Sequence, residues 1–359
     1  MDNTLGFTLT PISSNQTNSS CSRDNLLKTV VFPVLYSLLF LSGLSINGLA
    51  VWVFFRIPSR SHFIIYLKNI VVADVFMTLT FPFKVLSDSN MGSLGLRIFV
   101  CRVSSVIFYF TMYISILFFG LISIDRCRKT LQPFKRTNAS RLAHRKLLSW
   151  AIWGSLLALS LPNMILTSHR PISPYFKCSD LKTATGLLWH EVVNHVCQFI
   201  FWGNLVTVIV CYSLITKELY SSYARSKASS AGGVKCRDGK REGNSKDQPR
   251  RKNANVFLVL AVFFVCFVPF HFARVPYTIS QTRGRIFDCN LKLFLFQLKE
   301  STLWLSSLNS LLDPLIYFFL CKSFRTTLFK ILRLPPGTCS WLTGMGSETN
   351  STTMEDSTT

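Results

Sequence analysis

The stretch CFVPFHFARVPY, residues 266 to 277, brings a histidine and an arginine into an otherwise apolar segment. An unpaired charge in the hydrocarbon of a membrane costs at least a few kcal/mol, so ionisable side chains there usually face a cavity and serve a function. Arg274 lies about 35 Å along a helix from Arg251 at 1.5 Å per residue, which is close to a full membrane crossing. We therefore expect Arg274 at the far end of its helix, where it can meet water and a ligand.

A second cation, Lys299, is expected at the same end of the next apolar segment, since about 18 residues of helix separate it from Tyr317. Two like charges that converge need an anion between them or a neighbouring acid, and Glu300 is adjacent in the sequence. Cations at the rim of an aromatic site suit a ligand with a flat ring and several negative charges. A nucleotide has both features.

Further side chains are expected to line the same site. They are Ser105, Tyr109 and Tyr113 in one apolar segment, His190 and Asn194 in another, and His271, Arg274, Tyr277 and Gln281 in the stretch described above. Residues four apart lie on one face of a helix, as His190 and Asn194 do. A single tyrosine is more often a packing residue, and a surface pair of His190 with Glu191 is an alternative that the sequence leaves open.

The elements that position these residues are long apolar stretches. The chain has 359 residues, of which 49% are apolar and 31 are phenylalanine, more than a soluble domain of this size needs to bury. Each stretch is long enough to cross a membrane as a helix. They lie near 30–55, 63–86, 98–125, 146–167, 189–215, 255–280 and 292–320. The sequence thus predicts an all-α membrane protein with a bundle of seven transmembrane helices spanning 30–321.

The distribution of charge predicts the orientation. Most of the 39 Lys and Arg residues lie in alternate connecting segments, which places the N-terminus outside and the C-terminus in the cytoplasm of a multi-pass plasma-membrane protein. The net charge of +22 follows from this bias and favours contact with anionic membrane lipid, and we expect no binding to nucleic acid. The polar tail 1–29 shows no cleavable signal peptide, so the first span is expected to act as the signal anchor. Asn15 and Asn18 in this tail are glycosylation sequons.

The remaining segments are predicted to be linkers and tails. Residues 224–252 combine Gly, Ser and many charges, which is typical of a disordered cytoplasmic loop, and 334–359 is likewise a disordered tail. Residues 322–333 place apolar side chains on one helical face and cations on the other, as in a helix that lies on the membrane surface. Cys339 just beyond it is a candidate for palmitoylation.

Four of the eleven cysteines fall in segments expected outside the cell: Cys21, Cys101, Cys178 and Cys289. An even number in an oxidising space predicts two disulfides. Three pairings are possible, and the spacing alone does not decide among them.

Polar residues inside the spans indicate a switch. Asp74 and Asp313, with Asn47, Ser115 and Asn309, could line a small hydrated pocket that holds sodium, or they could form a purely structural hydrogen-bond network. Asp125 and Arg126 are expected at the cytoplasmic mouth of their span. There Arg126 can pair with Asp125 at rest and be released for a partner, as a two-state element requires.

An ordered set of motifs resembles the rhodopsin-like G-protein-coupled receptors: LKNIVVAD around Asp74, SIDRC with Asp125 and Arg126, and NSLLDPLIY with Asp313, Pro314 and Tyr317. Asn47 and Trp153 belong to the same set. The chain departs from the usual family pattern at Cys127, Phe267, Asp313 and Asn204, where tyrosine, tryptophan, asparagine and proline are common.

The segments SVIFYFTMYIS, CFVPFHFARVPYTISQT and KESTLWLSSLN resemble the purinergic nucleotide receptors, most closely those for ADP. This resemblance implies ADP as agonist, an inhibitory G protein as partner and lowered adenylate cyclase activity. Carried over by position, Tyr109, Asn163, His190 and Asn194 would hold the ring, and Arg274, Tyr277, Gln281, Lys299, Lys182 and Arg97 would meet the phosphates. It also implies the disulfides Cys101–Cys178 and Cys21–Cys289.

Other functions remain as alternatives. A UDP-sugar or a lysophospholipid would suit the same basic site. A transporter or channel would need internal repeats or a charged path through the membrane, and an intramembrane enzyme would need a catalytic constellation. We therefore expect a receptor that is not an enzyme and has no cofactor, with homo-oligomers as a further option.

Overall fold

The computed structural model describes residues 26–58, 61–132, 139–167, 176, 178–231, 247–282 and 288–333. Within these residues the chain is almost entirely helical, and seven helical segments are long and apolar enough to span a membrane. This confirms the predicted seven-helix architecture. The predicted sequons at Asn15 and Asn18, and Cys339, lie outside the described residues.

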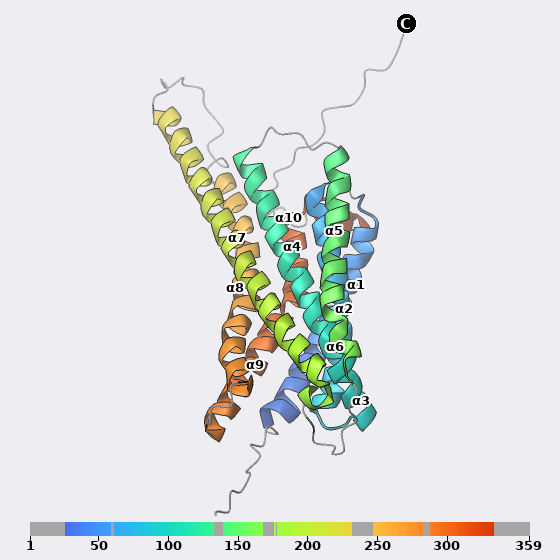
Figure 1. The fold of residues 1–359 in the computed structure, drawn as a ribbon. Coiled ribbons are helices and arrows are strands. Elements are labelled where there is room, and N and C mark those ends of the chain that lie inside the picture. Colours follow the sequence, from blue (N-terminus) through green and yellow to red (C-terminus); the bar gives the residue numbers. More distant parts are fainter. Residues whose placement is uncertain are drawn as a thin grey trace, which may run out of the picture.

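The helices run side by side as a bundle, and consecutive spans run in opposite directions (Figure 1). In chain order the elements are η1 (Leu27–Val31), α1 (Phe32–Phe55), α2 (His62–Asp88), α3 (Leu94–Phe99), η2 (Val100–Ser104), α4 (Ser105–Leu131), α5 (Ala139–Ser160), α6 (Pro162–Ile165), η3 (Cys178–Leu181), α7 (Ala184–Ala231), α8 (Asp247–Thr282), α9 (Cys289–Ser307), α10 (Asn309–Leu320) and α11 (Lys322–Ile331). The spans are η1 with α1, α2, α3 to α4, α5 with α6, α7, α8, and α9 with α10.

Two helices extend into the segment predicted to be disordered. α7 continues to Ala231 and α8 begins at Asp247, so both ends of the predicted loop 224–252 are helical. Once a helix is nucleated, each further residue adds a hydrogen bond at little entropic cost, and Ala, Arg and Lys favour the helix. The prediction of disorder is therefore wrong for 224–231 and 247–252, whereas 232–246 lies outside the described residues.

The third span forms the centre of the bundle. α4 packs against α2, α5, α7 and α8, and much of its surface is buried. At one end of the bundle, α11 turns back against the spans and buries Phe324, whose ring lies 5.1 Å from Phe54 and 6.0 Å from Tyr317. The predicted amphipathic helix after the seventh span is thus present, with its apolar face on the bundle.

Pro314 interrupts the hydrogen bonds of α10, because a proline has no N–H to donate to the carbonyl four residues earlier. That carbonyl belongs to Ser310, and it accepts a hydrogen bond of 2.7 Å from Asn47 Nδ2 on α1. A side-chain amide thereby replaces the missing backbone donor for a carbonyl that is buried inside the bundle. The first and seventh spans are joined at this point.

Asn204 on α7 provides a second link between spans, to α4. Its Nδ2 donates to the carbonyl of Ile116 at 2.7 Å, and the side chain lies directly over Gly120. A Cβ at Gly120 would overlap the Asn204 amide, so the close approach of α4 and α7 depends on the glycine. Asn204 is one of the positions at which the sequence departs from the pattern that it resembles, where proline is common.

Candidate functional site

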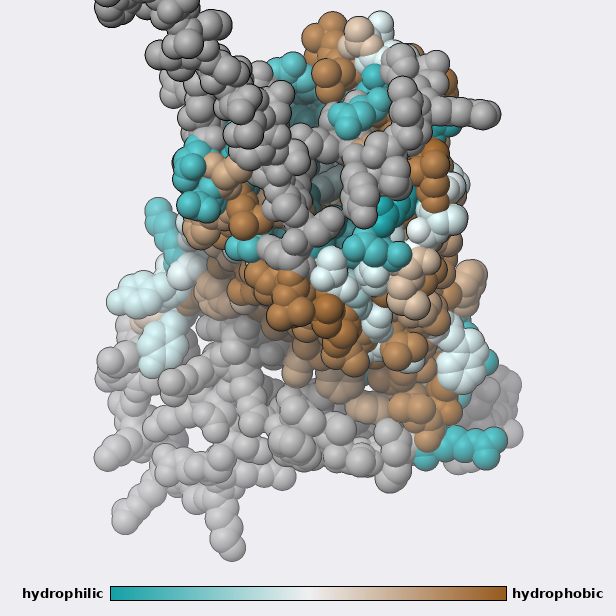
Figure 2. All heavy atoms as spheres, turned by 90° about the horizontal axis from the view of Figure 1, so that it is seen from below, coloured by the Kyte–Doolittle hydropathy of each residue, from teal (hydrophilic) through white to brown (hydrophobic). Residues whose placement is uncertain are grey.

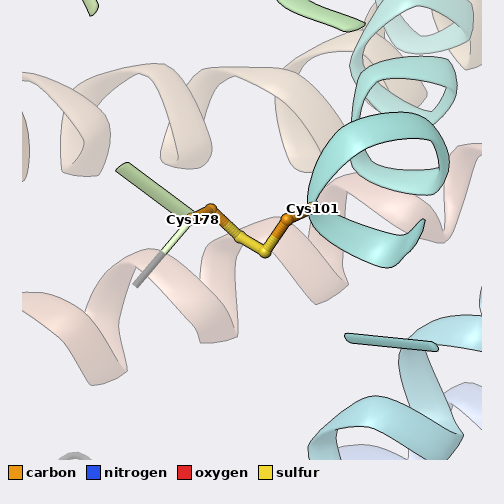
Figure 3. The surroundings of a disulfide bond; sticks show 2 residues. All are labelled: Cys101 and Cys178. Atoms are coloured by element: carbon orange, nitrogen blue, oxygen red, sulfur yellow. A yellow bond between two sulfur atoms is a disulfide. The ribbon is translucent and has the colours of Figure 1, made fainter. Parts of the chain in front are cut away.

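The end of the bundle that carries Cys101 is closed by a covalent link. Cys101 in η2 and Cys178 in η3 form a disulfide with their Cα atoms 5.3 Å apart (Figure 3). This confirms one of the two predicted pairs. Cys289 is also disulfide-bonded, but Cys21, the partner predicted for it, lies outside the described residues. We call this the Cys101 end, and the opposite one the Arg126 end.

Figure 2 views the bundle from the Cys101 end and shows hydrophilic residues in separate groups on this face, next to a broad apolar area. Three basic side chains from α8, α9 and the segment before α7 are found at this end: Arg274, Lys299 and Lys182. Each is held by polar or aromatic partners. We call the region that these three cations share the vestibule.

Arg274 reaches across from α8 to α7 and α4. Its Nη2 donates to Asn194 Oδ1, and the guanidinium carbon lies 4.9 Å from the ring centre of Tyr109 and 5.5 Å from that of Phe270. Nη1 is buried and has no hydrogen-bond partner among the described residues. The guanidinium is therefore fixed in place while part of its donor capacity is free for an anion.

Lys182 and His190 share one acceptor. Lys182 Nζ donates to Asn163 Oδ1 at 2.9 Å, and His190 Nδ1 lies 3.3 Å from the same oxygen. Burial lowers the pKa of Lys182 to about 8. The contact of His190 with Asn163 decides against the alternative of a surface pair of His190 with Glu191. Glu191 instead lies 4.0 Å from His195, and both of those side chains are exposed. His190 is within electrostatic range of both Lys182 and Arg274.

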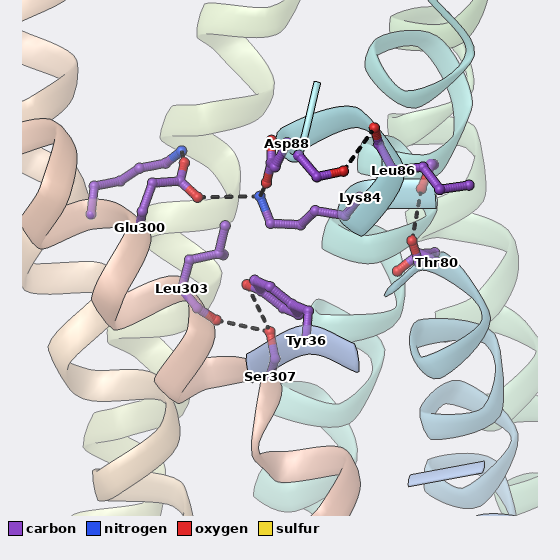
Figure 4. Close-up of polar contacts among 11 residues, drawn as sticks. Tyr36, Thr80, Lys84, Leu86, Asp88, Glu300, Leu303 and Ser307 are labelled. Atoms are coloured by element: carbon purple, nitrogen blue, oxygen red, sulfur yellow. Dashed lines mark hydrogen bonds and ion pairs between the residues drawn. The ribbon is translucent and has the colours of Figure 1, made fainter. Parts of the chain in front are cut away.

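Lys299 belongs to a charged network between α2 and α9 (Figure 4). Glu300 bridges two cations: Lys299, and Lys84 on α2, whose Nζ lies 3.2 Å from a Glu300 oxygen. Lys84 also pairs with Asp88 at 2.9 Å. Glu300 is 8% exposed. Its buried carboxylate lies between two ammonium groups and relieves the repulsion between them.

The predictions did not include Lys84. A lysine inside an apolar stretch is itself a functional signal, and Asp88 one turn later was a visible partner. The ammonium of Lys84 also lies 5.3 Å from the ring of Tyr36 on α1. Lys299 in turn lies 5.4 Å from the ring of Tyr277, so a predicted aromatic residue does border the predicted cation.

Tyr113 and His271 form a hydrogen-bonded pair deeper in the bundle than the vestibule. The tyrosine hydroxyl and His271 Nε2 are 3.0 Å apart, and His271 Nδ1 lies 2.8 Å from the Phe267 carbonyl. Phe201 stacks on the imidazole with ring centres 3.6 Å apart. Tyr113 is 2% exposed and His271 is fully buried, so in this conformation both serve the floor of the site.

The other predicted ligand residues are less tightly placed. Arg97 in α3 donates to Asn90, and Ser105 at the start of α4 is partly exposed. The backbone of Gln281 is helical, but its side chain is outside the described part of the structure. These residues remain predictions from the resemblance.

At the Arg126 end, one expectation is wrong. Asp125 pairs with Lys129 at 2.7 Å and lies 3.5 Å from His62, and no ion pair with Arg126 is found among the described residues. Arg126 instead lies 3.8 Å from the ring centre of Phe63 on α2. Lys129 is one turn from Asp125 and reaches its carboxylate, while the guanidinium of Arg126 is directed to Phe63.

The predicted polar pocket lies inside the bundle and is entirely buried. Its members are Asp74, Asn47, Ser115, Asn309 and Asp313. Asp74 Oδ2 accepts a hydrogen bond of 3.0 Å from Tyr317. Both Asp313 oxygens, Ser115 Oγ and the Asn309 amide lack hydrogen-bond partners among the described residues. Buried polar atoms of this kind call for a proton, water or cation, and the carboxylate and hydroxyl oxygens suit a hard cation such as sodium.

Comparison with known protein families decides the class. The family model described as 7 transmembrane receptor (rhodopsin family) matches residues 46–317. The chain belongs to this family. Three relatives refine the assignment. Purinoceptor 13 of Rattus norvegicus is 49% identical over 304 residues, covering 85% of each chain. Purinoceptor 14 of Bos taurus is 42% identical over 316 residues, covering 88% of this chain and 89% of the relative.

G-protein coupled receptor 87 of Mus musculus is 39% identical over 342 residues, covering 91% of each chain. This rhodopsin-family receptor is accordingly of the purinoceptor class, a group of nucleotide receptors and multi-pass plasma-membrane proteins. The predicted receptor class is confirmed.

Proposed function

We propose that this receptor is activated by extracellular ADP and signals through an inhibitory G protein to lower adenylate cyclase activity. The observation that carries the proposal is the presence of three cations at the Cys101 end: Arg274 beside Tyr109, Lys299 beside Tyr277, and Lys182 bound to Asn163. Three cations next to an aromatic wall suit a diphosphate joined to a flat ring.

The present contacts of the cations suggest how a diphosphate would bind. Arg274 donates to the amide oxygen of Asn194, and Lys182 to that of Asn163. A neutral amide oxygen is a weaker acceptor than a phosphate oxygen, because charge-assisted hydrogen bonds are about twice as strong as neutral ones. Phosphate oxygens would replace these amide oxygens as the acceptors for Arg274 and Lys182. The released amides of Asn163 and Asn194 would then be free to bind the adenine ring.

The Arg126 end would face the cytoplasm and the G protein. The basic residues concentrated in the connecting segments at that end support this orientation. Asp125 and Arg126 would contribute to the coupling surface. Asp74, Asp313, Pro314 and Tyr317 lie in the spans between this surface and the vestibule, and we assign the conformational switch to them, with sodium as the candidate occupant of their pocket.

A UDP-sugar is the second candidate ligand, and Glu300 favours it. A carboxylate inside a site for a polyanion is unexpected unless the ligand also carries donors. The hydroxyl groups of a sugar could donate to Glu300 while Lys299 and Lys84 meet the diphosphate.

Cyclic AMP measurement in cells that express the chain separates these ligands. ADP, UDP-glucose and a lysophospholipid would each be applied after stimulation of adenylate cyclase, with and without pertussis toxin to block inhibitory G proteins. A toxin-sensitive fall in cyclic AMP with ADP at the lowest concentration is expected. A response to UDP-glucose or lysophospholipid but not to ADP would contradict the proposal, and a toxin-resistant response would contradict the assigned transducer.

A further inference from the structure

A groove of about 770 Å³ lies between α7 and α8, away from the vestibule. Its lining comes from one face of each helix: Ile209, Tyr212, Ser213, Thr216, Lys217 and Tyr220 on α7, and Phe257, Leu260 and Phe264 on α8. Several of these side chains are exposed, among them Ile209 at 44% and Phe264 at 37%. The groove therefore opens on the outer surface of the bundle, where lipid surrounds a membrane protein.

The level of the groove follows from its neighbours. Cys211 and Ile215 on α7 pack against Cys127, which directly follows Arg126 on α4. The groove thus lies at the Arg126 end. Lys217 and Tyr220 are about 3 and 8 Å farther along α7 than Ile215 by helical rise, which places them at the membrane boundary. Tyr220 is 75% exposed, as is typical of aromatic side chains among lipid headgroups.

The chemistry changes along the groove. Toward the bundle centre it is lined by Ile209, Leu260 and Phe264, which have no polar atoms to satisfy. Toward the boundary it carries the hydroxyl of Tyr220 and the ammonium of Lys217, while the hydroxyl of Thr216 donates to the Tyr212 carbonyl. The side chain of Lys217 is exposed and has no ion-pair partner among the described residues, whereas the next residue, Glu218, pairs with Arg225.

We propose that this groove binds one anionic phospholipid of the inner leaflet. An acyl chain fills the apolar part, and the acidic headgroup meets the ammonium of Lys217 and the hydroxyl of Tyr220. A surface potential attracts every lysine near the membrane, but Lys217 differs in standing at the mouth of an apolar groove that fixes the lipid beneath it. The inference rests on the proposed orientation, which places this end in the cytoplasm.

Lipid retention by the purified full-length receptor tests the proposal. The receptor is reconstituted in nanodiscs of phosphatidylcholine with a minor fraction of phosphatidylserine, washed in detergent, and its retained lipids are measured by mass spectrometry. Lys217→Gln removes the cation at the groove, and Lys330→Gln is the matched control on α11, where the lysine is exposed at the same end. Ser213→Trp fills the groove from an exposed position without entering the core.

Lys217→Gln should lower the retained ratio of phosphatidylserine to phosphatidylcholine about fivefold. Lys330→Gln should leave the ratio unchanged, and Ser213→Trp should abolish the preference. A parental ratio in Lys217→Gln, or an equal loss in Lys330→Gln, would overturn the proposal in favour of unspecific attraction. The assay uses neither nucleotide nor G protein, so its outcome does not depend on whether ADP is the agonist. Antibody access to a C-terminal tag in intact cells tests the orientation separately.

Discussion

The guanidinium of Arg274 lies 4.9 Å from the ring centre of Tyr109, while its Nη2 donates to Asn194 on a third helix. Three spans therefore fix one cation, which is partly buried and keeps an unused donor at Nη1. An arginine held in this way can bind an anion without losing much side-chain entropy.

Arg274→Ala should weaken ADP binding about 10- to 150-fold, because a charge-assisted contact contributes roughly 1.5–3 kcal/mol. Arg274→Lys should recover only part of the affinity, since an ammonium cannot reproduce the bidentate fork of a guanidinium. Radioligand binding on cells normalised for surface receptor measures both variants. An Arg274→Ala receptor that reaches the surface and binds ADP with parental affinity would refute the phosphate role.

Glu300→Ala should lower the thermal stability of the ligand-free receptor. Removing one partner of a buried pair leaves the other charge uncompensated at a cost of about 3 kcal/mol or more. Here Lys299 loses its carboxylate, while Lys84 keeps Asp88. The melting temperature in detergent measures the effect, and Glu191→Ala, which removes an exposed glutamate, is the control. If both variants had the same melting temperature, the network around Glu300 would not contribute to stability.

Binding of ADP should become weaker as the pH rises from about 7 to 9, by about five- to tenfold. Burial lowers the pKa of Lys182 to about 8, so the ammonium is charged below this pH and loses its proton above it. The terminal phosphate does not confound the result, because its second pKa of about 6 leaves it ionised throughout.

Lys182→Arg is the control for this pH dependence, since an arginine stays charged over the whole range. The variant should bind ADP with nearly constant affinity from pH 7 to 9. A decline as steep as that of the parental receptor would show that another group titrates.

Arg126→Ala should leave nucleotide binding intact and reduce nucleotide-stimulated GTP exchange by about tenfold or more. Arg126 lies about 25 Å below Tyr109 by helical rise, too far to touch the ligand. Lys129→Ala, one turn away and also near Asp125, is the matched control and should exchange nearly normally. Parental exchange in Arg126→Ala would show that this residue has no part in coupling.

Cys101→Ser should prevent most of the receptor from reaching the cell surface. The disulfide closes a loop with a sequence separation of 77 residues, and a link over that length contributes about 4 to 5 kcal/mol in the chain-entropy account. Surface staining measures the loss, and Cys197→Ser, which removes a free thiol, is the control. Normal staining of Cys101→Ser with an unchanged ADP response would contradict this expectation.

The fold was largely predictable because hydrocarbon imposes the same demand on every span. A stretch must be apolar and long enough to satisfy its own backbone, so each of the seven spans is visible in the sequence. Helix ends in water obey no such rule, which is why the extension of α7 to Ala231 was missed. Charged, helix-favouring residues there are compatible with both a helix and a disordered loop.

The candidate site was predictable in composition but not in its pairs. Helical rise alone placed Arg274 and Lys299 at one level. It did not reveal that Arg274 contacts Asn194 or that Lys182 contacts Asn163, because those pairs depend on the rotation of each helix in the packed bundle. The expected pair of Asp125 with Arg126 was wrong for the same reason, since Lys129 on the next turn faces the carboxylate.

The contact of Asn204 with α4 constrains how this receptor can vary. Gly120 has no room for a Cβ while the amide of Asn204 lies over it, and the same amide holds the Ile116 carbonyl. Substitutions at the two positions are therefore ordered in time: residue 204 must become smaller before residue 120 can gain a side chain. A lineage that takes these steps in the reverse order passes through a receptor whose third and fifth spans are forced apart.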